Sequence, residues 1–283
     1  MTAPTGDGTG TAGLPASLVL VGAGKMGGAM LRGWLALGMD GKAVTIVDPY
    51  PSQEIAALAA QHQIRLNPAL AGIAAPEALV LSIKPQTLDA AASDIAPLVG
   101  PKTLVLSIMA GKTIANIAAR LPSAGAIVRA MPNTPAAVGR GITGAAASPG
   151  VDAPRRAMAG ALLSAIGAVE WLDREDWIDT VTAVSGSGPA YVFWLTECMA
   201  KAGEAAGLPA DLAMRLARAT VEGSGELMFR DQQTTASQLR VNVTSPGGTT
   251  AAALDVLMAP DGLEPLMRKA IAAAKQRAGD LSG

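Results

Sequence analysis

The sequence predicts a two-part α/β protein in which a parallel sheet covered by helices is followed by an all-helical part. Over residues 17–172, short apolar runs alternate with helical segments at the spacing of strands joined by crossover helices. Over residues 173–283, apolar residues recur at helical spacing and strand-like runs are almost absent. Residues 1–16 are rich in Gly, Thr, Ala and Pro without periodicity, so we expect a disordered tail there.

The first expected element is a strand that runs directly into a glycine turn and a helix. Apolar Leu18–Val21 lead into the loop GAGKMGG at residues 22–28. Such a loop binds the pyrophosphate of a dinucleotide, because its glycines allow a tight turn and close approach while the helix N-terminus presents free N–H groups. A second apolar run, residues 43–47, ends in Asp48. This carboxylate follows the last motif glycine by about 20 residues, where a ribose-binding acid is expected. We therefore predict a Rossmann-type domain over residues 17–172.

The remaining elements of this domain repeat the alternation of strand and helix. We expect strands at 64–66, 78–83, 103–108, 126–130, 142–147 and 168–172, and helices near 54–61, 86–91, 113–120 and 152–165. Ligands of parallel sheets bind beyond the carboxyl ends of the strands. We therefore expect Lys84-Pro85 and residues 107–111 and 131–134 to line one crevice with the glycine loop.

The helical part contains one loop with an unusual density of donors. Pro189 follows Gly186-Ser187-Gly188 at the expected start of a long helix, where its missing N–H does no harm. Between later helices lies VTSPGGTT, residues 243–250, with a helix start directly after it. Four hydroxyl groups and a helix N-terminus can present several donors to a small anion.

Composition excludes several classes of partner. The formal net charge is -1, so electrostatics give no reason to expect nucleic acid or an anionic membrane surface. No run reaches the roughly 18 apolar residues of a membrane span, and we expect a cytoplasmic protein. A single cysteine, Cys198, and a single histidine, His62, make a disulfide or a Cys/His metal site unexpected.

Six motifs together resemble the pyrroline-5-carboxylate reductases. They are GAGKMGGAM (22–30), SIKPQ (82–86), SIMAG (107–111), RAMPNTPAAVG (129–139), VSGSGPAYVF (184–193) and VTSPGGTT (243–250). The resemblance implies a Rossmann domain followed by a helical substrate and dimerisation domain, residues 173–283, in a homodimer or a larger ring of dimers. It also implies hydride transfer from NADH or NADPH to the cyclic imine 1-pyrroline-5-carboxylate, giving L-proline in the last step of proline biosynthesis.

The resemblance also implies a role for individual residues. Thr250 is the expected catalytic residue, with its hydroxyl placed to hydrogen-bond the ring nitrogen. Without the resemblance, the residues alone favour a structural role for Thr250 as a helix-start residue capped by its hydroxyl, and the resemblance reverses this reading. The implied substrate-binding residues are Glu175, Asn242, Ser245, Gly247, Gly248, Thr249 and Thr250. The implied cofactor-binding residues are Gly22, Gly24, Lys25, Met26, Gly27, Asp48, Asn67, Lys84, Pro85, Ala110 and Gly111. No metal is expected.

Two positions depart from the family pattern. Asp48 stands where many members have Ser or Asn with a nearby Arg, and no Arg or Lys occurs between Lys42 and Arg65. A carboxylate there accepts a hydrogen bond from a free ribose 2′-OH and repels a 2′-phosphate, which predicts a preference for NADH. Met109 replaces a small alanine, and we expect it to narrow the nicotinamide end of the cleft.

Three other functions compete with this interpretation. A promiscuous imine reductase would differ only in a few pocket side chains. A β-hydroxyacid-dehydrogenase-like oxidoreductase would carry a lysine on the first long helix of the second domain, where here Lys201 comes late. A non-catalytic dinucleotide-sensing protein would have no need of the hydroxyl-rich loop at residues 245–250.

Overall fold

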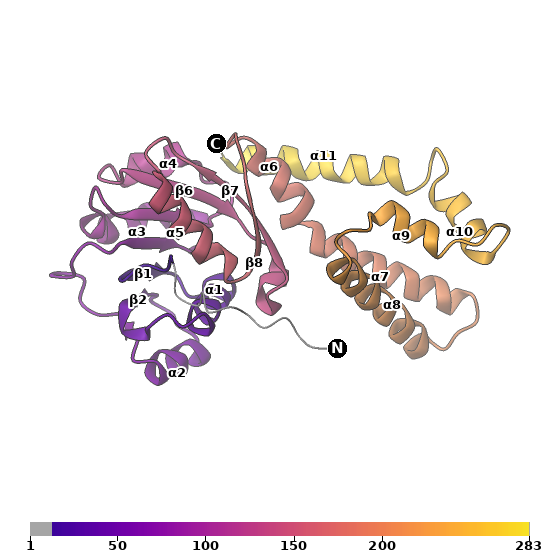
Figure 1. Ribbon diagram of the computed structural model, residues 1–283, viewed down its shortest axis with the longest axis horizontal. Helices are drawn as coiled ribbons and strands as arrows, with labels where there is room; N and C mark the ends of the chain where they lie inside the picture. The colour runs from indigo at the N-terminus through magenta and orange to yellow at the C-terminus, as the bar shows by residue number, and fades with distance from the viewer. Residues whose placement is uncertain (1–12, 283) are drawn as a thin grey trace. The chain divides into compact units, whose positions relative to one another are not determined.

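The structure is a computed structural model that describes residues 13–282 (Figure 1). It divides into two compact units, Met1–Gly186 with Lys275–Gly283, and Ser187–Ala274. Most of the predicted tail, residues 1–12, lies outside the described residues. Residues 13–16, the part of the predicted tail that the structure describes, belong to the fold. Leu14 packs against the core, and the Ala16 amide donates to Glu77 Oε2 at 2.8 Å.

The first unit is built on an eight-stranded sheet with the order β3-β2-β1-β4-β5-β6-β7-β8. The first six strands of the chain are parallel, and the strand order reverses direction between β1 and β4, which is where ligands bind in such sheets. The strands are β1 Leu18–Val21, β2 Val44–Val47, β3 Arg65–Leu66, β4 Ala78–Leu81, β5 Leu104–Ser107, β6 Ala126–Met131, β7 Gly141–Ala147 and β8 Gly167–Trp171.

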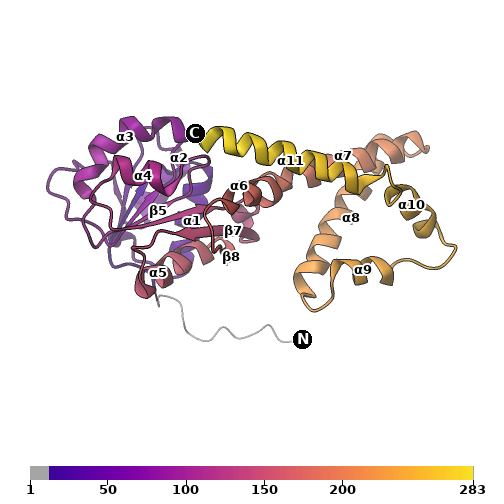
Figure 2. The same ribbon diagram turned by 90° about the horizontal axis from the view of Figure 1, so that it is seen from above.

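Helices cover both faces of this sheet, and the strand residues alternate between the two cores. Leu18 and Leu20 of β1 belong to one apolar cluster, and Val19 and Val21 belong to the other. The first cluster includes residues of α1 Lys25–Ala36, α2 Gln53–Gln61 and α5 Ala153–Ser164. The second includes residues of α3 Leu88–Ile95 and α4 Ile114–Arg120. Figure 2 shows α3 and α4 on the side of the sheet opposite α5.

Local sequence explains where these helices begin. Ser52 Oγ accepts from the Ile55 amide at 3.2 Å at the start of α2, and Asp152 Oδ1 accepts from the Arg155 amide at 3.0 Å at the start of α5. Thr113 forms a capping box at the start of α4. Short helical turns complete the unit at η1 Gly41–Ala43, η2 Pro85–Thr87, η3 Ala96–Leu98 and η4 Thr134–Val138.

Strand β7 departs from the parallel arrangement. It pairs antiparallel with β6, whereas β8 pairs parallel with β7. The connection from Met131 to Gly141 contains only the short turn η4. A parallel connection needs about a dozen residues or more, usually including a helix, so this chain can only fold back. The longer connection through α5 does permit the parallel β7–β8 pair.

The first compact unit continues past the predicted domain boundary at residues 172/173. It includes α6 Trp177–Val181 and the π-helical turn η5 Thr182–Gly186. Ile178 of α6 is buried, and Val181 lies so close to Gly144 of β7 that a Cβ on Gly144 would be 2.8 Å from it. Packing on β7 therefore keeps this segment with the sheet, although its sequence pattern is helical.

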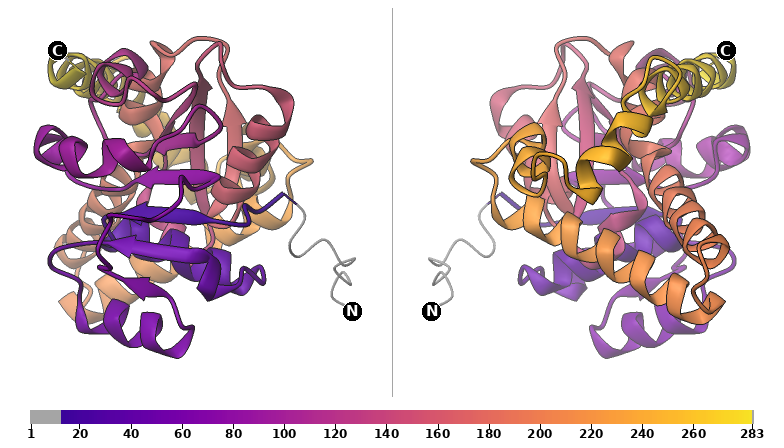
Figure 3. Two further views of the ribbon diagram at one scale, coloured as in Figure 1. Left: turned by 90° about the vertical axis from the view of Figure 1, so that its left-hand side faces the viewer. Right: turned by 90° about the vertical axis from the view of Figure 1, so that its right-hand side faces the viewer.

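In the second unit, every secondary-structure element that the structure describes is a helix (Figure 3). These are α7 Gly188–Ala205, α8 Ala210–Arg230, α9 Ala236–Asn242, α10 Thr249–Leu257 and the first part of α11 Leu263–Ser282. Small residues bring α7 and α8 together, as at Gly203 beside Ala213. Phe193, Trp194 and Leu227 are exposed, so the apolar side chains of this unit form a surface rather than a closed core. None of the helices described is long and apolar enough to cross a membrane.

Candidate active site

The glycine loop joins β1 to α1 with very little room for side chains. Gly22 has φ +85°, a conformation that L-residues other than glycine rarely adopt. A Cβ on Gly27 would collide with the Gly22 carbonyl oxygen and lie 2.8 Å from Ser82 Oγ. Within the described chain, α1 begins after Gly24 without a side-chain cap. Its first N–H groups and the positive end of its dipole are therefore available to an anion.

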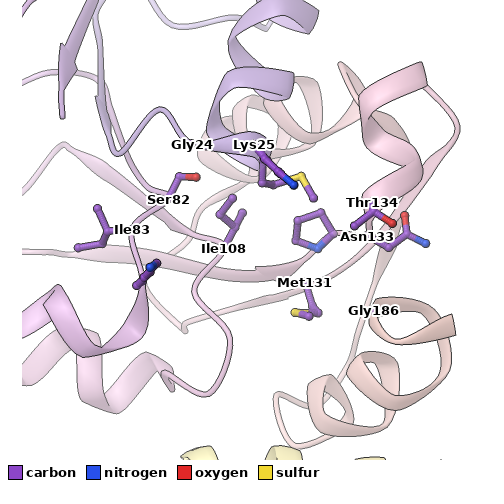
Figure 4. A pocket seen from close by; sticks show the side chains of 12 residues that line it. Gly24, Lys25, Ser82, Ile83, Ile108, Met131, Asn133, Thr134 and Gly186 are labelled. Carbon is purple, nitrogen blue, oxygen red and sulfur yellow. The ribbon is translucent and has the colours of Figure 1, made fainter. Parts of the chain in front are cut away.

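A cavity of about 420 Å³ opens beside this loop (Figure 4). Its walls come from the glycine loop and from the ends of β4, β5 and β6, as expected for a parallel sheet. Lys25 and Lys84 place two cations at its edge. The lining residues are Gly24, Lys25, Met26, Ser82, Ile83, Lys84, Ile108, Met131, Pro132, Asn133, Thr134 and Gly186. The free amides and the two lysines fit the phosphates of a dinucleotide.

Asp48 and Asn67 meet at the end of β2. The carboxylate of Asp48 accepts hydrogen bonds from the amides of Ala23 (2.8 Å) and Tyr50 (2.9 Å). The Asn67 side chain accepts from the Asp48 amide at 2.8 Å and donates to the Asp48 carbonyl at 2.7 Å. Asn67 itself has φ +48°. Asp48 therefore has a structural role that sequence alone did not reveal: it ties the glycine loop to the turn after β2.

The other predicted cofactor residues lie at the ends of β4 and β5. Lys84 is extended and exposed before Pro85, which begins η2. Ala110 and Gly111 form the turn between β5 and α4, and Gly111 lies against Leu281 near the end of α11. Ile108, which directly follows β5, lines the cavity.

The expectation for Met109 is wrong. Its side chain is 2% exposed and packs in the apolar cluster that includes Ile117, Leu121 and Ile127, whereas its neighbour Ile108 lines the cavity. Successive residues after a strand point to opposite sides, and the sequence motif does not say which of them faces the cleft. The methionine therefore fills the core and does not narrow the nicotinamide end.

The structure adds residues that motif reasoning missed. Ser82 and Ile83 line the cavity directly before Lys84, and Gly186 reaches it from η5. Asn133 holds this last wall in place: it donates to the Ser185 carbonyl at 3.1 Å and accepts from the Ile142 amide at 3.0 Å. Ser82 and Ile83 belong to the motif at 82–86 that also contains Lys84, and Gly186 belongs to the motif at 184–193. The motifs did not say which of their residues would face the cavity.

Glu175, a predicted substrate ligand, lies in the first unit between β8 and α6. Its Oε1 accepts from the Ile114 amide at 2.7 Å and from Arg129 Nη1 at 3.2 Å. Arg129 is almost fully buried on β6 and also pairs with Asp179 Oδ1 at 3.4 Å. Glu175 thus joins the start of α4 to β6, two residues before Met131 of the cavity wall.

The other predicted substrate residues lie in the second unit, at the end of α9 and the start of α10. Asn242 Oδ1 accepts from Gln238 Nε2 at 2.8 Å. The Ser245 carbonyl accepts from the Gly248 amide at 3.0 Å, which closes the loop. Gly248, not Thr250, is the N-cap of α10, so the reading of Thr250 as a cap is wrong. Thr250 stands half-buried in the first helical turn.

Fold and site together define a dinucleotide-dependent oxidoreductase with a Rossmann-type domain. Two family models match the chain: the one described as pyrroline-5-carboxylate reductase dimerisation over residues 175–281, and the one described as NADP oxidoreductase coenzyme F420-dependent over residues 17–111. The chain is 40% identical over 266 residues to the pyrroline-5-carboxylate reductase of Pseudomonas aeruginosa, covering 94% of this chain and 96% of the relative. The chain belongs to the pyrroline-5-carboxylate reductase family.

Solved structures agree with this assignment. A pyrroline-5-carboxylate reductase from Coxiella burnetii matches with a TM-score of 0.87 and 32% identity, covering 95% of this chain and 99% of that one. Plasmodium falciparum pyrroline carboxylate reductase with NADP bound matches with a TM-score of 0.78 and 26% identity, covering 95% and 98%. The predicted fold class and family are confirmed, and the competing functions are not favoured. The roles of individual residues stay predictions.

Proposed function

We propose that this chain reduces 1-pyrroline-5-carboxylate to L-proline with hydride from a nicotinamide dinucleotide. The observation that supports this proposal is the cavity beside the glycine loop. The chain that forms this cavity belongs to the pyrroline-5-carboxylate reductase family. Bound there, the dinucleotide supplies the hydride at its nicotinamide ring. The chain's own part is to hold the phosphates at the start of α1 and to orient the reactants, because positioning alone can supply much of the rate.

The substrate is held, in this proposal, by the loop before α10. Gly248 caps α10 without a side chain, so the first-turn amides can receive the substrate carboxylate, with Ser245 and Thr249 beside them. The Thr250 hydroxyl would hydrogen-bond the ring nitrogen, which ends protonated. Asn242 precedes this loop at the end of α9 and is proposed to contact the substrate.

Loss of the Thr250 hydroxyl tests this role. Thr250→Val keeps the shape of the side chain, and we expect kcat/KM for the imine to fall by about ten- to a hundredfold, the loss expected for a hydrogen bond to a charged group. Thr250→Ser, which keeps the hydroxyl at the same position, is the matched control and should lose much less. Equal activity of Thr250→Val and the unmodified enzyme in an NADH absorbance assay would contradict the role.

The enzyme is further proposed to prefer NADH, because Asp48 places a carboxylate at the end of β2 and no Arg or Lys lies between Lys42 and Arg65. Asp48 also holds the amides of Ala23 and Tyr50, so its replacement can disturb the loop as well as the charge. Asp48→Asn keeps an acceptor oxygen without the charge, whereas Asp48→Ser shortens the side chain. If charge decides, both variants gain kcat/KM with NADPH relative to NADH.

The comparison of NADH with NADPH is the first assay to make. Equal or higher kcat/KM with NADPH in the unmodified enzyme would overturn the cofactor preference and leave the reductase assignment standing. Absence of turnover with either dinucleotide would overturn the assignment itself.

The working unit is proposed to be a homodimer or a ring of dimers. The second unit exposes large apolar side chains on α7, α8 and α10, and the matching family model is that of a dimerisation domain. Light scattering during gel filtration should give an even multiple of the 28.4 kDa chain mass.

We also propose a cytoplasmic location, since the exposed free thiol of Cys198 suits a reducing compartment.

A further inference from the structure

Tyr50 is an aromatic side chain that the fold leaves almost completely in solvent. It is 91% exposed, the largest exposed fraction among the large apolar side chains of the described residues. It lies in the turn that follows β2, two residues after Asp48. An isolated exposed apolar residue needs no explanation by itself. The hydrogen bonds that fix the backbone beneath the Tyr50 side chain do call for an explanation.

The turn that carries Tyr50 is held by hydrogen bonds on two sides. The Tyr50 amide donates to Asp48 Oδ1 at 2.9 Å, while Asp48 Oδ2 accepts from the Ala23 amide of the glycine loop at 2.8 Å. From the other side, the Asn67 side chain makes two hydrogen bonds with the backbone of Asp48. The ring is therefore presented outward from a stiff support that is bonded directly to the phosphate-binding loop.

Two prolines stiffen the turn further. Pro49 and Pro51 flank Tyr50, and each pyrrolidine ring restricts its own φ to about −65°. A turn restricted in this way loses little conformational entropy when a ligand orders it. No Arg or Lys stands between Lys42 and Arg65, so an aromatic face is the chemistry that this segment offers to a flat ligand.

We infer that Tyr50 is the stacking platform for the adenine base of the dinucleotide, which sets the affinity for the adenosine half of the cofactor. The inference rests on the proposed cofactor site. The acid at the end of β2 marks the ribose of the adenosine half. Adenine is bonded to that same ribose, so it must lie close to Asp48, beyond the carboxyl end of β2. The Tyr50 ring is exposed at this end of the strand. Base–aromatic stacking changes affinity by roughly five- to a hundredfold.

Removal of the ring should weaken only ligands that contain adenosine. Tyr50→Ala is expected to raise KM for NADH and Kd for ADP-ribose by about tenfold, with kcat unchanged. KM for reduced nicotinamide mononucleotide, which has no adenosine half, should stay the same. Tyr50→Phe keeps the aromatic face and should restore both constants. Because Tyr50 is exposed, the melting temperature should not change in either variant.

The outcomes separate this inference from the proposed function. If the unmodified enzyme turns over NADH and Tyr50→Ala leaves KM and the ADP-ribose Kd unchanged, the inference is wrong and the reductase assignment stands. An equal loss with reduced nicotinamide mononucleotide would also overturn it, because the turn would then act through the glycine loop. If the unmodified enzyme neither binds ADP-ribose nor oxidises NADH, both proposals fall.

Discussion

The glycine loop offers a test in which one substitution, made at two positions, should have opposite effects. A Cβ on Gly24 meets no atom within 4 Å, and the backbone there has an ordinary φ of -68°. A Cβ on Gly27 would collide with the Gly22 carbonyl oxygen. Gly24→Ala should therefore leave the folded chain intact, whereas Gly27→Ala must displace the backbone.

The expected magnitudes follow from this difference. Gly24→Ala removes freedom from the unfolded chain and should be neutral or stabilising by up to about 1 kcal/mol. Its methyl group stands where a pyrophosphate would approach the backbone, so one charge-assisted hydrogen bond of about 1.5–3 kcal/mol is lost on binding. That loss corresponds to roughly a ten- to hundredfold rise in Kd for NADH. Gly27→Ala should cost about 1–3 kcal/mol of folding stability as well.

Calorimetric titration with NADH and thermal unfolding measure the two effects separately. Gly160→Ala in α5 is the matched control, because a Cβ there also meets no atom within 4 Å. It should stabilise the chain by about 0.5–1 kcal/mol without changing the NADH affinity. Unchanged affinity in Gly24→Ala would refute the reasoning, since the phosphates would then not approach the loop at this glycine. A large loss of stability in Gly24→Ala would refute it too.

Two further predictions concern charged side chains of the first unit. Arg129→Met should lower the free energy of unfolding by about 3 kcal/mol in urea titrations, because the buried guanidinium is the partner of both Glu175 and Asp179; an unchanged stability would contradict this. A hydrogen bond and the charge of Arg120 hold the pKa of Asp89 below its ordinary value of 3.8. The stabilisation from this pair is therefore complete above the unfolded pKa and is lost as pH falls through the folded pKa. In Arg120→Gln the pKa of Asp89 should rise in an NMR titration, while the melting temperature at pH 7 barely changes because the pair is exposed; a pKa that stays low would show another cause.

The boundary between the two compact units does not coincide with the start of the matching dimerisation model. The dimerisation model begins at residue 175, whereas the second compact unit begins at Ser187. The intervening segment, with α6 and η5, packs on the sheet and also contributes Gly186 to the cavity wall. The family model therefore places the boundary where the similarity to its relatives begins, at residue 175. The compact units place it where the contacts within the structure change, at Ser187.

Features that depend on neighbouring residues were predictable from the sequence. Leu18–Val21 had to be a strand and residues 22–24 a tight turn before a helix, because apolar runs and glycines act through local geometry. The distance from this turn to Asp48 predicted where the carboxylate would stand, and it does lie against the loop. The helical character of the second unit followed from periodicity in the same way.

Features that depend on distant partners were decided only by the tertiary structure. Met109 belongs to the core rather than the cleft, and Glu175 is bonded to Arg129, 46 residues earlier in the chain. Strand β7 turned antiparallel because its connection to β6 is too short for a crossover. A sequence pattern records whether a side chain is apolar or charged and how it repeats. Which group that side chain meets depends on how the sheet and its helices close around it, and that is a property of the whole fold.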